Sequence, residues 1–360
     1  MTRVHNFSAG PSALPLVALE RARDEMLDYA GSGMSIMEQS HRAAVYEGVH
    51  DEALALIREL MSVPDTHDIL LLQGGASQQF AQVPMNLLHP GQSADYVVTG
   101  VWGKKAIKEA KLVGQARVAA STEESDGKFF RVPSQDEIKP DAQAAFFHVT
   151  TNNTVMGTQF SRVPESPGVP VVLDASSDIM GRPLDVAKYG LIYAGAQKNL
   201  GPSGITVVII DKQLIETGRR DIPYFFQYRT HAEAKSLSNT IPTFGVYMLR
   251  NVMLWLKELG GVSAIYKINQ EKAARLYRVL EERSDLYQLK VEKESRSIMN
   301  VTWNLATAEA EKACVAAATK AGLIGLKGHR IVGGLRASIY NAVPLSSVDA
   351  LCEFLGNYRP

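Results

Sequence analysis

Residues 169–210 read VPVVLDASSDIMGRPLDVAKYGLIYAGAQKNLGPSGITVVII, a stretch in which short apolar runs alternate with polar turns. Runs of this length that are polar only at their ends are typical of strands buried on both faces. Six such runs lie at Ile69–Leu72, Tyr96–Val98, Ala144–Val149, Val169–Leu173, Leu191–Ala194 and Ile205–Ile210. Helical patterns such as Gln78–Leu88 and Lys104–Leu112 separate them. The sequence therefore predicts an α/β large domain, with a mostly parallel mixed sheet covered by helices.

The pattern of expected secondary structure changes after Thr243. A helical pattern at Tyr247–Leu259 ends at Gly260 and Gly261, and a second amphipathic helix follows. Two alternating runs and two further helices complete the chain, at Ile298–Leu305, Leu335–Tyr340, Glu309–Ala321 and Ser346–Leu355. We predict a large domain at 15–260 and a smaller C-terminal α+β domain at 261–360, to which residues 1–14 return.

Composition excludes several classes of protein. Hydrophobic residues make up 46% of the 360 residues, enough for a sizeable core. Lys plus Arg and Asp plus Glu both total 38, so no global charge attracts nucleic acid or an anionic membrane. The two cysteines, Cys314 and Cys352, cannot build a disulfide framework or a Cys-rich zinc site. We expect no nucleic-acid or membrane partner, no metal site and a cytoplasmic location.

Lys198 is the first candidate for chemistry, because small residues and glycines surround it in YAGAQKNLGPSG, directly after a strand. Partial desolvation there would lower its pKa and make it a nucleophile for an aldehyde, whereas an isolated lysine in this position is more often an ordinary surface residue. Asp174 ends the strand VVLD, at the edge where open α/β sheets bind ligands. It either caps the following turn or pairs with a cationic ring nitrogen. Such a lysine and aspartate together are typical of pyridoxal phosphate (PLP) sites.

A third element is LLLQGGASQQF, in which a strand runs through Gly74 and Gly75 into a helix. Free N–H groups at that helix start would cradle a phosphate, with the Ser77 hydroxyl as an added donor. The dinucleotide, Walker A, hydrolase-elbow and zincin motifs are absent from the sequence. Dehydrogenase, phosphate-loop NTPase, α/β-hydrolase and zincin readings therefore lack their usual support.

Taken together, these segments resemble the phosphoserine aminotransferase family of class V, fold-type I PLP enzymes. The resemblance covers the chain through FSAGPSALP, GMSIMEQSHR, LQGGAS, TNNTVMGTQ, DASSDIM, AGAQKNLGPSG, SNTIPTFGVYMLRN and GHRIVGGLRASIYNA. It implies one PLP per subunit, joined as a Schiff base to Lys198, with Asp174 at the ring nitrogen. The other cofactor contacts that it implies are Trp102 stacked on the ring, Thr154 hydrogen-bonded to it, Ala76, Ser77 and Gln197 at the phosphate, and Asn239 and Thr240 from the neighbouring subunit. A homodimer with shared active sites follows.

We expect arginines and histidines to bind the substrate. Arg336, in GGLRASIYN, suits bidentate binding of an α-carboxylate. Two His-Arg pairs, His41 with Arg42 and His329 with Arg330, would make a local pocket for a dianion. The resemblance implies that His41 and Arg42 come from the partner subunit. It also implies that Ala9, where the family often has a polar residue, leaves its ligand contact to Ser8 or to backbone.

The expected function is reversible transamination of 3-phosphohydroxypyruvate with L-glutamate, giving O-phospho-L-serine and 2-oxoglutarate, in L-serine biosynthesis. The same resemblance leaves 4-phosphohydroxy-L-threonine as a further product. Two alternatives stand beside this: another class V enzyme, such as a serine–glyoxylate aminotransferase, and a PLP-binding protein without catalysis.

Overall fold

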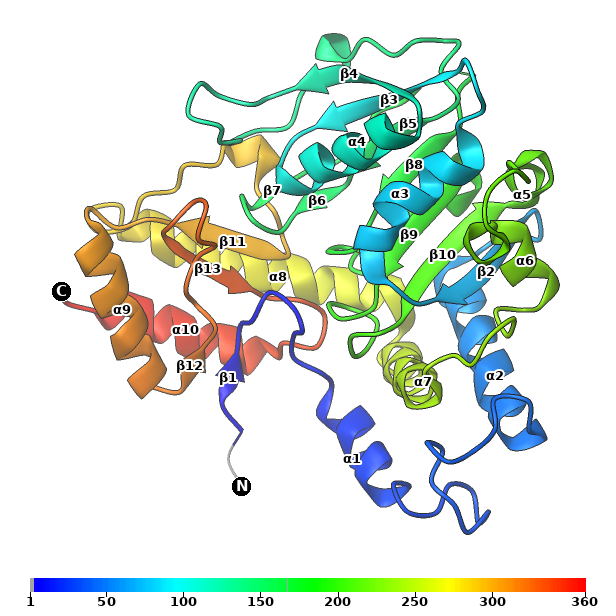
Figure 1. Ribbon diagram of the computed structural model, residues 1–360. Coiled ribbons are helices and arrows are strands. Elements are labelled where there is room, and N and C mark those ends of the chain that lie inside the picture. Colours follow the sequence, from blue (N-terminus) through cyan, green and yellow to red (C-terminus); the bar gives the residue numbers. More distant parts are fainter. Residues whose placement is uncertain (1–2, 167) are drawn as a thin grey trace.

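A seven-stranded sheet forms the centre of the larger part of the molecule in the computed structural model, which describes residues 3–166 and 168–360 (Figure 1). The strand order is β2-β10-β9-β8-β5-β3-β4. The strands are β2 (His67–Leu72), β3 (Ser93–Val98), β4 (Gln115–Ser121), β5 (Phe147–Thr150), β8 (Val171–Asp174), β9 (Leu191–Gly195) and β10 (Thr206–Asp211). Only β10 pairs antiparallel with its neighbours in this sheet, so the predicted mostly parallel mixed sheet is confirmed.

All six apolar runs of the sequence become strands of this sheet. The strand β4 was missed because it lies at the edge of the sheet, where its residues are mostly exposed or half-buried, only Ala119 is buried, and there is no run of large apolar residues. The run predicted to begin at Ala144 starts three residues before β5, since Ala144 closes a turn with Asp141.

Helices bury both faces of the sheet, and alternate strand residues point to opposite cores. In β10, Val207 and Ile209 join one core, whereas Val208 and Ile210 join the other. The first core is covered by α1 (Leu16–Asp24), α2 (Ala44–Met61) and α7 (Thr243–Glu258). The second is covered by α3 (Gly75–Leu87), α4 (Val101–Val113), α5 (Lys212–Thr217) and α6 (Tyr228–Glu233). Figure 1 shows α3 and α4 lying across the sheet.

The C-terminal part has its own core around a pair of antiparallel strands, β11 (Asn300–Trp303) and β13 (Leu335–Ser338). Its helices are α8 (Gly261–Glu282), α9 (Ala308–Lys320) and α10 (Leu345–Asn357). The N-terminal strand β1 (His5–Asn6) pairs with β12 (Leu323–Ile324), and Phe7 is buried in this third core. The helix α8 contributes Ile265 to the first core and Leu276 to the third, so it belongs to both parts. The boundary at 260/261 stays a prediction.

The remaining elements are short. They are the hairpin of β6 (Asn152–Asn153) and β7 (Thr158–Gln159), and the 3-10 helices η1 (Gln135–Glu137), η2 (Val186–Lys188), η3 (Tyr224–Phe226) and η4 (Lys293–Ser295). Across the described residues, none of the helices combines the length and the apolar character needed to cross a bilayer.

A buried lysine joins α8 to the turn after β13. The Lys272 side chain is 0% exposed, and its Nζ donates to the carbonyl oxygens of Ile339 (2.9 Å), Tyr340 (2.7 Å) and Val343 (3.2 Å). A protonated amine has three donors, so each of its hydrogens finds an acceptor. The same turn is tied to the large part through Asn341, whose N–H donates to Asn199 Oδ1 (3.0 Å). This polar joint fixes the smaller part beside the sheet edge.

Lys272→Met should lower the thermal midpoint of unfolding by at least about 4 °C, because it removes a donor from three buried carbonyls and leaves those of Ile339 and Val343 with no other donor among the described residues. Scanning calorimetry or near-UV circular dichroism measures this shift. Lys267→Met is the matched control, since Lys267 lies on the same helix but is exposed, and it should leave the midpoint within about 1 °C. Equal midpoints for the two variants would contradict the assigned role of Lys272.

Candidate active site

Loops that follow strands of the sheet meet at one cavity of about 130 Å³. The strands β2, β8 and β9 run in the same direction, so their carboxyl ends share one edge of the sheet. The lining residues are Gly75, Ala76, Ser77, Phe80, Trp102, Thr150, Asn152, Asp174, Ser176, Ser177, Gln197 and Lys198. Six predicted cofactor residues are thus brought together: Ala76, Ser77, Trp102, Asp174, Gln197 and Lys198.

Lys198 lies in a tight turn after β9. The N–H groups of Leu200 and Gly201 both donate to the Ala196 carbonyl, at 3.1 and 2.9 Å, and close the turn around the lysine. Its Nζ donates to Thr154 Oγ1 at 2.6 Å. The pKa of Lys198 is lowered to about 8, chiefly by burial and in smaller part by the Arg336 charge, while the Asp174 carboxylate opposes this shift. A sizeable fraction of the amine is therefore neutral near physiological pH, as a nucleophile requires.

Asp174 is the last residue of β8 and is 4% exposed. Its Oδ1 accepts a hydrogen bond from the Ser176 N–H at 3.0 Å. Burial raises the pKa of Asp174, whereas the Ser176 hydrogen bonds and the Lys198 charge lower it. The buried carboxylate would be stabilised by a cationic partner in the cavity.

The strand β2 leads into a helix start suited to an anion. Gly74 (φ 85°) precedes α3, and Gly75 (φ 66°) is its first residue. A Cβ on Gly74 would lie 2.7 Å from the Cβ of Gln78, so this turn needs glycine for space as well as for its positive φ. Ala76 and Ser77 present their N–H groups in the first helical turn, where the helix dipole favours negative charge.

Asn239 and Thr240 lie beside this helix start but do not line the cavity. Asn239 Nδ2 donates to Gln73 Oε1 at 3.2 Å, directly before Gly74, and Thr240 is exposed.

Trp102 lies in the first turn of α4 and lines the cavity. Its Nε1 is buried and has no hydrogen-bond partner among the described residues. Lys105, one turn later, places its Nζ 4.7 Å from the centre of the indole ring. The indole offers a flat surface at the cavity wall, as stacking on a planar ring requires.

Arg336 reaches the site from β13 in the smaller part. Its Nη1 donates to the Thr154 carbonyl at 3.1 Å, and Lys198 binds the hydroxyl of the same threonine. Its Nε is buried and finds no partner within the described residues. His329 lines a small cavity of about 20 Å³ together with Arg336, and Arg330 is exposed next to it. Burial and the charges of Arg336 and Arg330 lower the pKa of His329. These three predicted substrate residues therefore lie together.

His41 and Arg42 are not brought into this site by their own chain. They lie in the segment between α1 and α2, and neither lines the cavity around Lys198. Arg42 is exposed and has no ion-pair partner among the described residues. At the N-terminus, the Ala9 carbonyl accepts from Tyr340 Oη at 2.9 Å, so that backbone acceptor is already engaged.

Several residues around the cavity were not predicted. Ser176 and Ser177 follow Asp174, Thr150 is the last residue of β5, and Asn152 is the first residue of β6; all four line the cavity. Their position at or just after the ends of strands is the signal that could have found them. Tyr193, paired in register with Asp174, lies within hydrogen-bond distance of His148 Nε2 (2.9 Å). No local pattern marks that contact, because it joins two strands.

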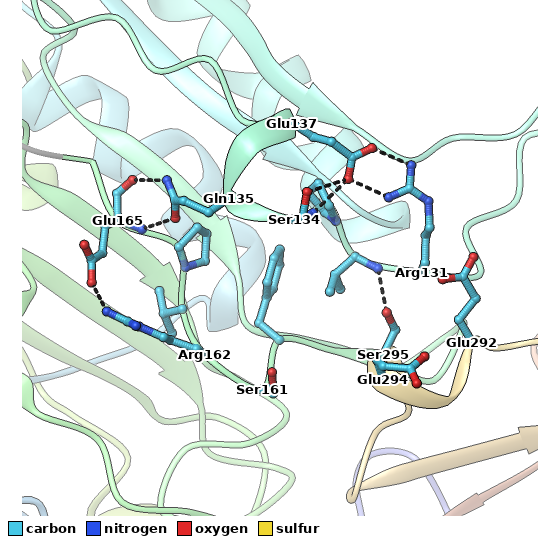
Figure 2. Close-up of a pocket in the computed structure, with 15 residues that line it drawn as sticks. Arg131, Ser134, Gln135, Glu137, Ser161, Arg162, Glu165, Glu292, Glu294 and Ser295 are labelled. Atoms are coloured by element: carbon cyan, nitrogen blue, oxygen red, sulfur yellow. Dashed lines mark hydrogen bonds and ion pairs between the residues drawn. The ribbon is translucent and has the colours of Figure 1, made fainter.

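A wider cavity of about 510 Å³ lies elsewhere, between residues 131–137, 160–165 and 292–295 (Figure 2). Figure 2 shows its arginines already paired, Arg131 with Glu137 at 2.7 Å and Arg162 with Glu165. It is lined by no lysine, histidine or cysteine and by none of the predicted site residues. Chemistry rather than size therefore selects the smaller cavity as the active site.

The smaller cavity fits a flat, phosphorylated aromatic aldehyde. It combines a helix start for the phosphate, an indole for the ring, a buried carboxylate for a ring nitrogen and a lysine of lowered pKa for the aldehyde. The unpartnered Trp102 Nε1 and Arg336 Nε are donors left available at the same place.

Comparisons with known proteins agree with this chemistry. The family model Aminotransferase class-V matches residues 4–351. A phosphoserine aminotransferase from Lysinibacillus sphaericus is 49% identical over 357 residues, covering 99% of this chain and 98% of that protein. A phosphoserine aminotransferase solved to follow radiation damage of its Schiff base has a TM-score of 0.95 and 50% identity, with 98% of each chain covered. The PLP-bound enzyme from Trichomonas vaginalis has a TM-score of 0.93 and 36% identity, covering 98% of this chain and 99% of that one.

Fold and site thus define a class V aminotransferase. Within that class, the chain belongs to the phosphoserine aminotransferase family, as its full-length relatives show.

The lowered pKa of Lys198 predicts a distinct pH profile for its reactivity. In the cofactor-free protein, reductive methylation of Lys198 should rise with pH around a midpoint near 8, because only the neutral amine reacts. Peptides that carry exposed lysines should continue to gain label up to about pH 10.5. Mass spectrometry of the digested protein separates the two groups. A Lys198 profile that follows the exposed lysines would show that burial does not tune this amine.

Proposed function

We propose that this chain catalyses the reversible transfer of an amino group from L-glutamate to 3-phosphohydroxypyruvate, giving 2-oxoglutarate and O-phospho-L-serine, in L-serine biosynthesis. The proposal rests mainly on one observation: Lys198 and Arg336, from different parts of the chain, both bind Thr154. Arg336 in turn lines a small cavity with His329, next to Arg330. A reactive amine is thereby set beside groups suited to a substrate with two anionic ends. The same proposal leaves 4-phosphohydroxy-L-threonine as a further product.

The proposed cofactor is PLP, one per subunit, attached to Lys198. Ala76, Ser77 and Gln197 would hold its phosphate, Trp102 would cover its ring, and Thr154 would hydrogen-bond it. When bound, PLP supplies an aldehyde and an electron-accepting ring. The PLP-bound relative from Trichomonas vaginalis supports this assignment.

Asp174 and Lys198 divide the proton chemistry between them. Asp174, buried at the end of β8, would keep the cofactor's ring nitrogen protonated, and that positive charge would in turn offset the cost of burying the carboxylate. Lys198 Nζ, neutral in part at physiological pH, would remove the α-proton of the amino donor and return a proton to the product. Thr154 Oγ1 orients this amine.

Binding of the two anionic groups falls to different residues. The planar guanidinium of Arg336 would hold the α-carboxylate, with its unpartnered Nε as one of the donors. His329 and Arg330, joined by His41 and Arg42 of the partner subunit, would hold the phosphate or the side-chain carboxylate of glutamate. A neutral serine side chain does not need such a pocket, which disfavours the serine–glyoxylate alternative.

The substrate assignment is tested with the PLP-loaded protein in a steady-state assay. With 2-oxoglutarate as acceptor, kcat/KM for phosphoserine should exceed that for serine by at least about 100-fold, because serine leaves the cationic pocket without its anion. Glutamate formation is the measured product. Faster turnover of serine with glyoxylate would favour the other class V activity. If titration with glutamate leaves the cofactor's absorbance unchanged, the result would favour a non-catalytic PLP-binding protein.

The functional unit that we propose is a homodimer with shared active sites. The segment that leads to His41 and Arg42 exposes three apolar side chains, Leu27 (85%), Met34 (42%) and Met37 (52%). Such a surface suits burial against a second copy of the chain. We also propose a cytoplasmic location, which two free cysteines support.

Shared sites predict that two defective variants rescue each other. Mixing Lys198→Ala with Arg42→Ala under conditions of subunit exchange should restore up to about one quarter of wild-type activity, because half the dimers gain one intact site. Lys198→Ala mixed with Arg330→Ala is the matched control and should restore none, since both residues act in the same subunit's site. Equal recovery in both mixtures, or none in either, would refute the shared site.

A further inference from the structure

Lys105 is a cation next to the active site to which the proposed mechanism gives no role. It lies on α4, three residues after Trp102, and its Nζ stands 4.7 Å from the centre of the indole ring. Among the described residues, no carboxylate lies within ion-pair distance of it. Its neighbour Lys104 differs, because Lys104 Nζ is 2.5 Å from Glu123 Oε1. One lysine of this pair is neutralised by its surroundings and the other is not.

Lys105 is linked to the cavity through the indole of Trp102. Trp102 lines the same cavity as Lys198 and Ser77, and a lysine that lies over an indole is held by the ring's negative face. The side chain is exposed, so its ammonium remains hydrated and available. It is therefore an exposed cation held against an indole that lines the cavity, rather than a freely moving surface lysine.

The charge of Lys105 also acts on the substrate histidine. Three charges act on His329, from Arg336, Arg330 and Lys105, and each of them lowers the pKa of the imidazole. All three are positive, and they come from two different parts of the chain. Positive charges placed this close repel one another, and a bound anion would offset that repulsion.

We infer that Lys105 is a specificity-determining residue that favours the phosphate of the substrate over the side-chain carboxylate of glutamate. The inference rests on the proposed function, because it assigns Lys105 to the same substrate pocket. A phosphomonoester carries about −1.5 to −2 charges at pH 7, whereas a carboxylate carries one. A compact ammonium with three rotatable donors suits a tetrahedral oxyanion. Removal of the Lys105 ammonium should therefore weaken the binding of the phosphorylated substrate more than the binding of glutamate.

The two half-reactions allow this difference to be measured on the PLP-loaded enzyme. Phosphoserine and glutamate are each mixed with it separately, and the cofactor's absorbance reports an apparent dissociation constant for each. Lys105→Met should weaken phosphoserine binding about 3- to 10-fold and glutamate binding by less than about 2-fold. Lys105→Arg, which keeps the charge, should restore phosphoserine binding. Lys104→Met is the matched control and should change neither.

Added salt provides a second readout that depends on charge alone. Phosphoserine binding should fall less steeply with ionic strength in Lys105→Met than in the wild type, because one cation has been removed. Unchanged phosphoserine binding in Lys105→Met would overturn the inference. Equal weakening of both substrates would also overturn it, since that result indicates a displaced indole. If the wild type reacts with glutamate but not with phosphoserine, the proposed function fails instead.

Discussion

The active site depends on keeping a carboxylate and an amine in one small, poorly hydrated cavity. Asp174 is almost fully buried at the end of β8, and Lys198 lies in the turn after the adjacent strand β9. Burial penalises the charged form of each group, so it raises the pKa of Asp174 and lowers that of Lys198 to about 8. This environment leaves the amine partly neutral, and it leaves the carboxylate in need of a cationic partner. A protonated ring nitrogen in the cavity would meet that need.

The second constraint is the connection between the two parts of the chain. Thr154 is the meeting point, because its hydroxyl accepts from Lys198 and its carbonyl from Arg336. Behind them, Lys272 binds three carbonyls of the turn after β13, and Asn341 in that turn binds Asn199, next to Lys198. The guanidinium and the amine are thus positioned by one continuous set of buried hydrogen bonds.

Charge at the site is local, since the whole chain has a formal net charge of zero. Arg336 and His329 line the small cavity of about 20 Å³, and the charges of Arg336, Arg330 and Lys105 all act on the imidazole, while the arginines of the wider cavity in Figure 2 are paired with glutamates. Unpaired cations near a reactive amine would favour a substrate that is anionic at both ends. Membership of the phosphoserine aminotransferase family agrees with that selection.

The sequence by itself determined the layered α/β fold, because strands buried on both faces require apolar runs and helices require a 3.6-residue period. It also located Lys198, Asp174 and the helix start at Gly74, since each directly follows an apolar strand. It did not determine that β10 runs antiparallel, nor that β4 closes the edge, because hydrophobic periodicity carries no direction and an edge strand needs no apolar run. The contacts of Arg336 with Thr154, of Lys272 with its carbonyls and of Lys105 with Trp102 were decided only by the tertiary structure. The strength of each contact depends on how far apart the two partners lie and on how deeply they are buried. No local pattern of residues encodes these two quantities.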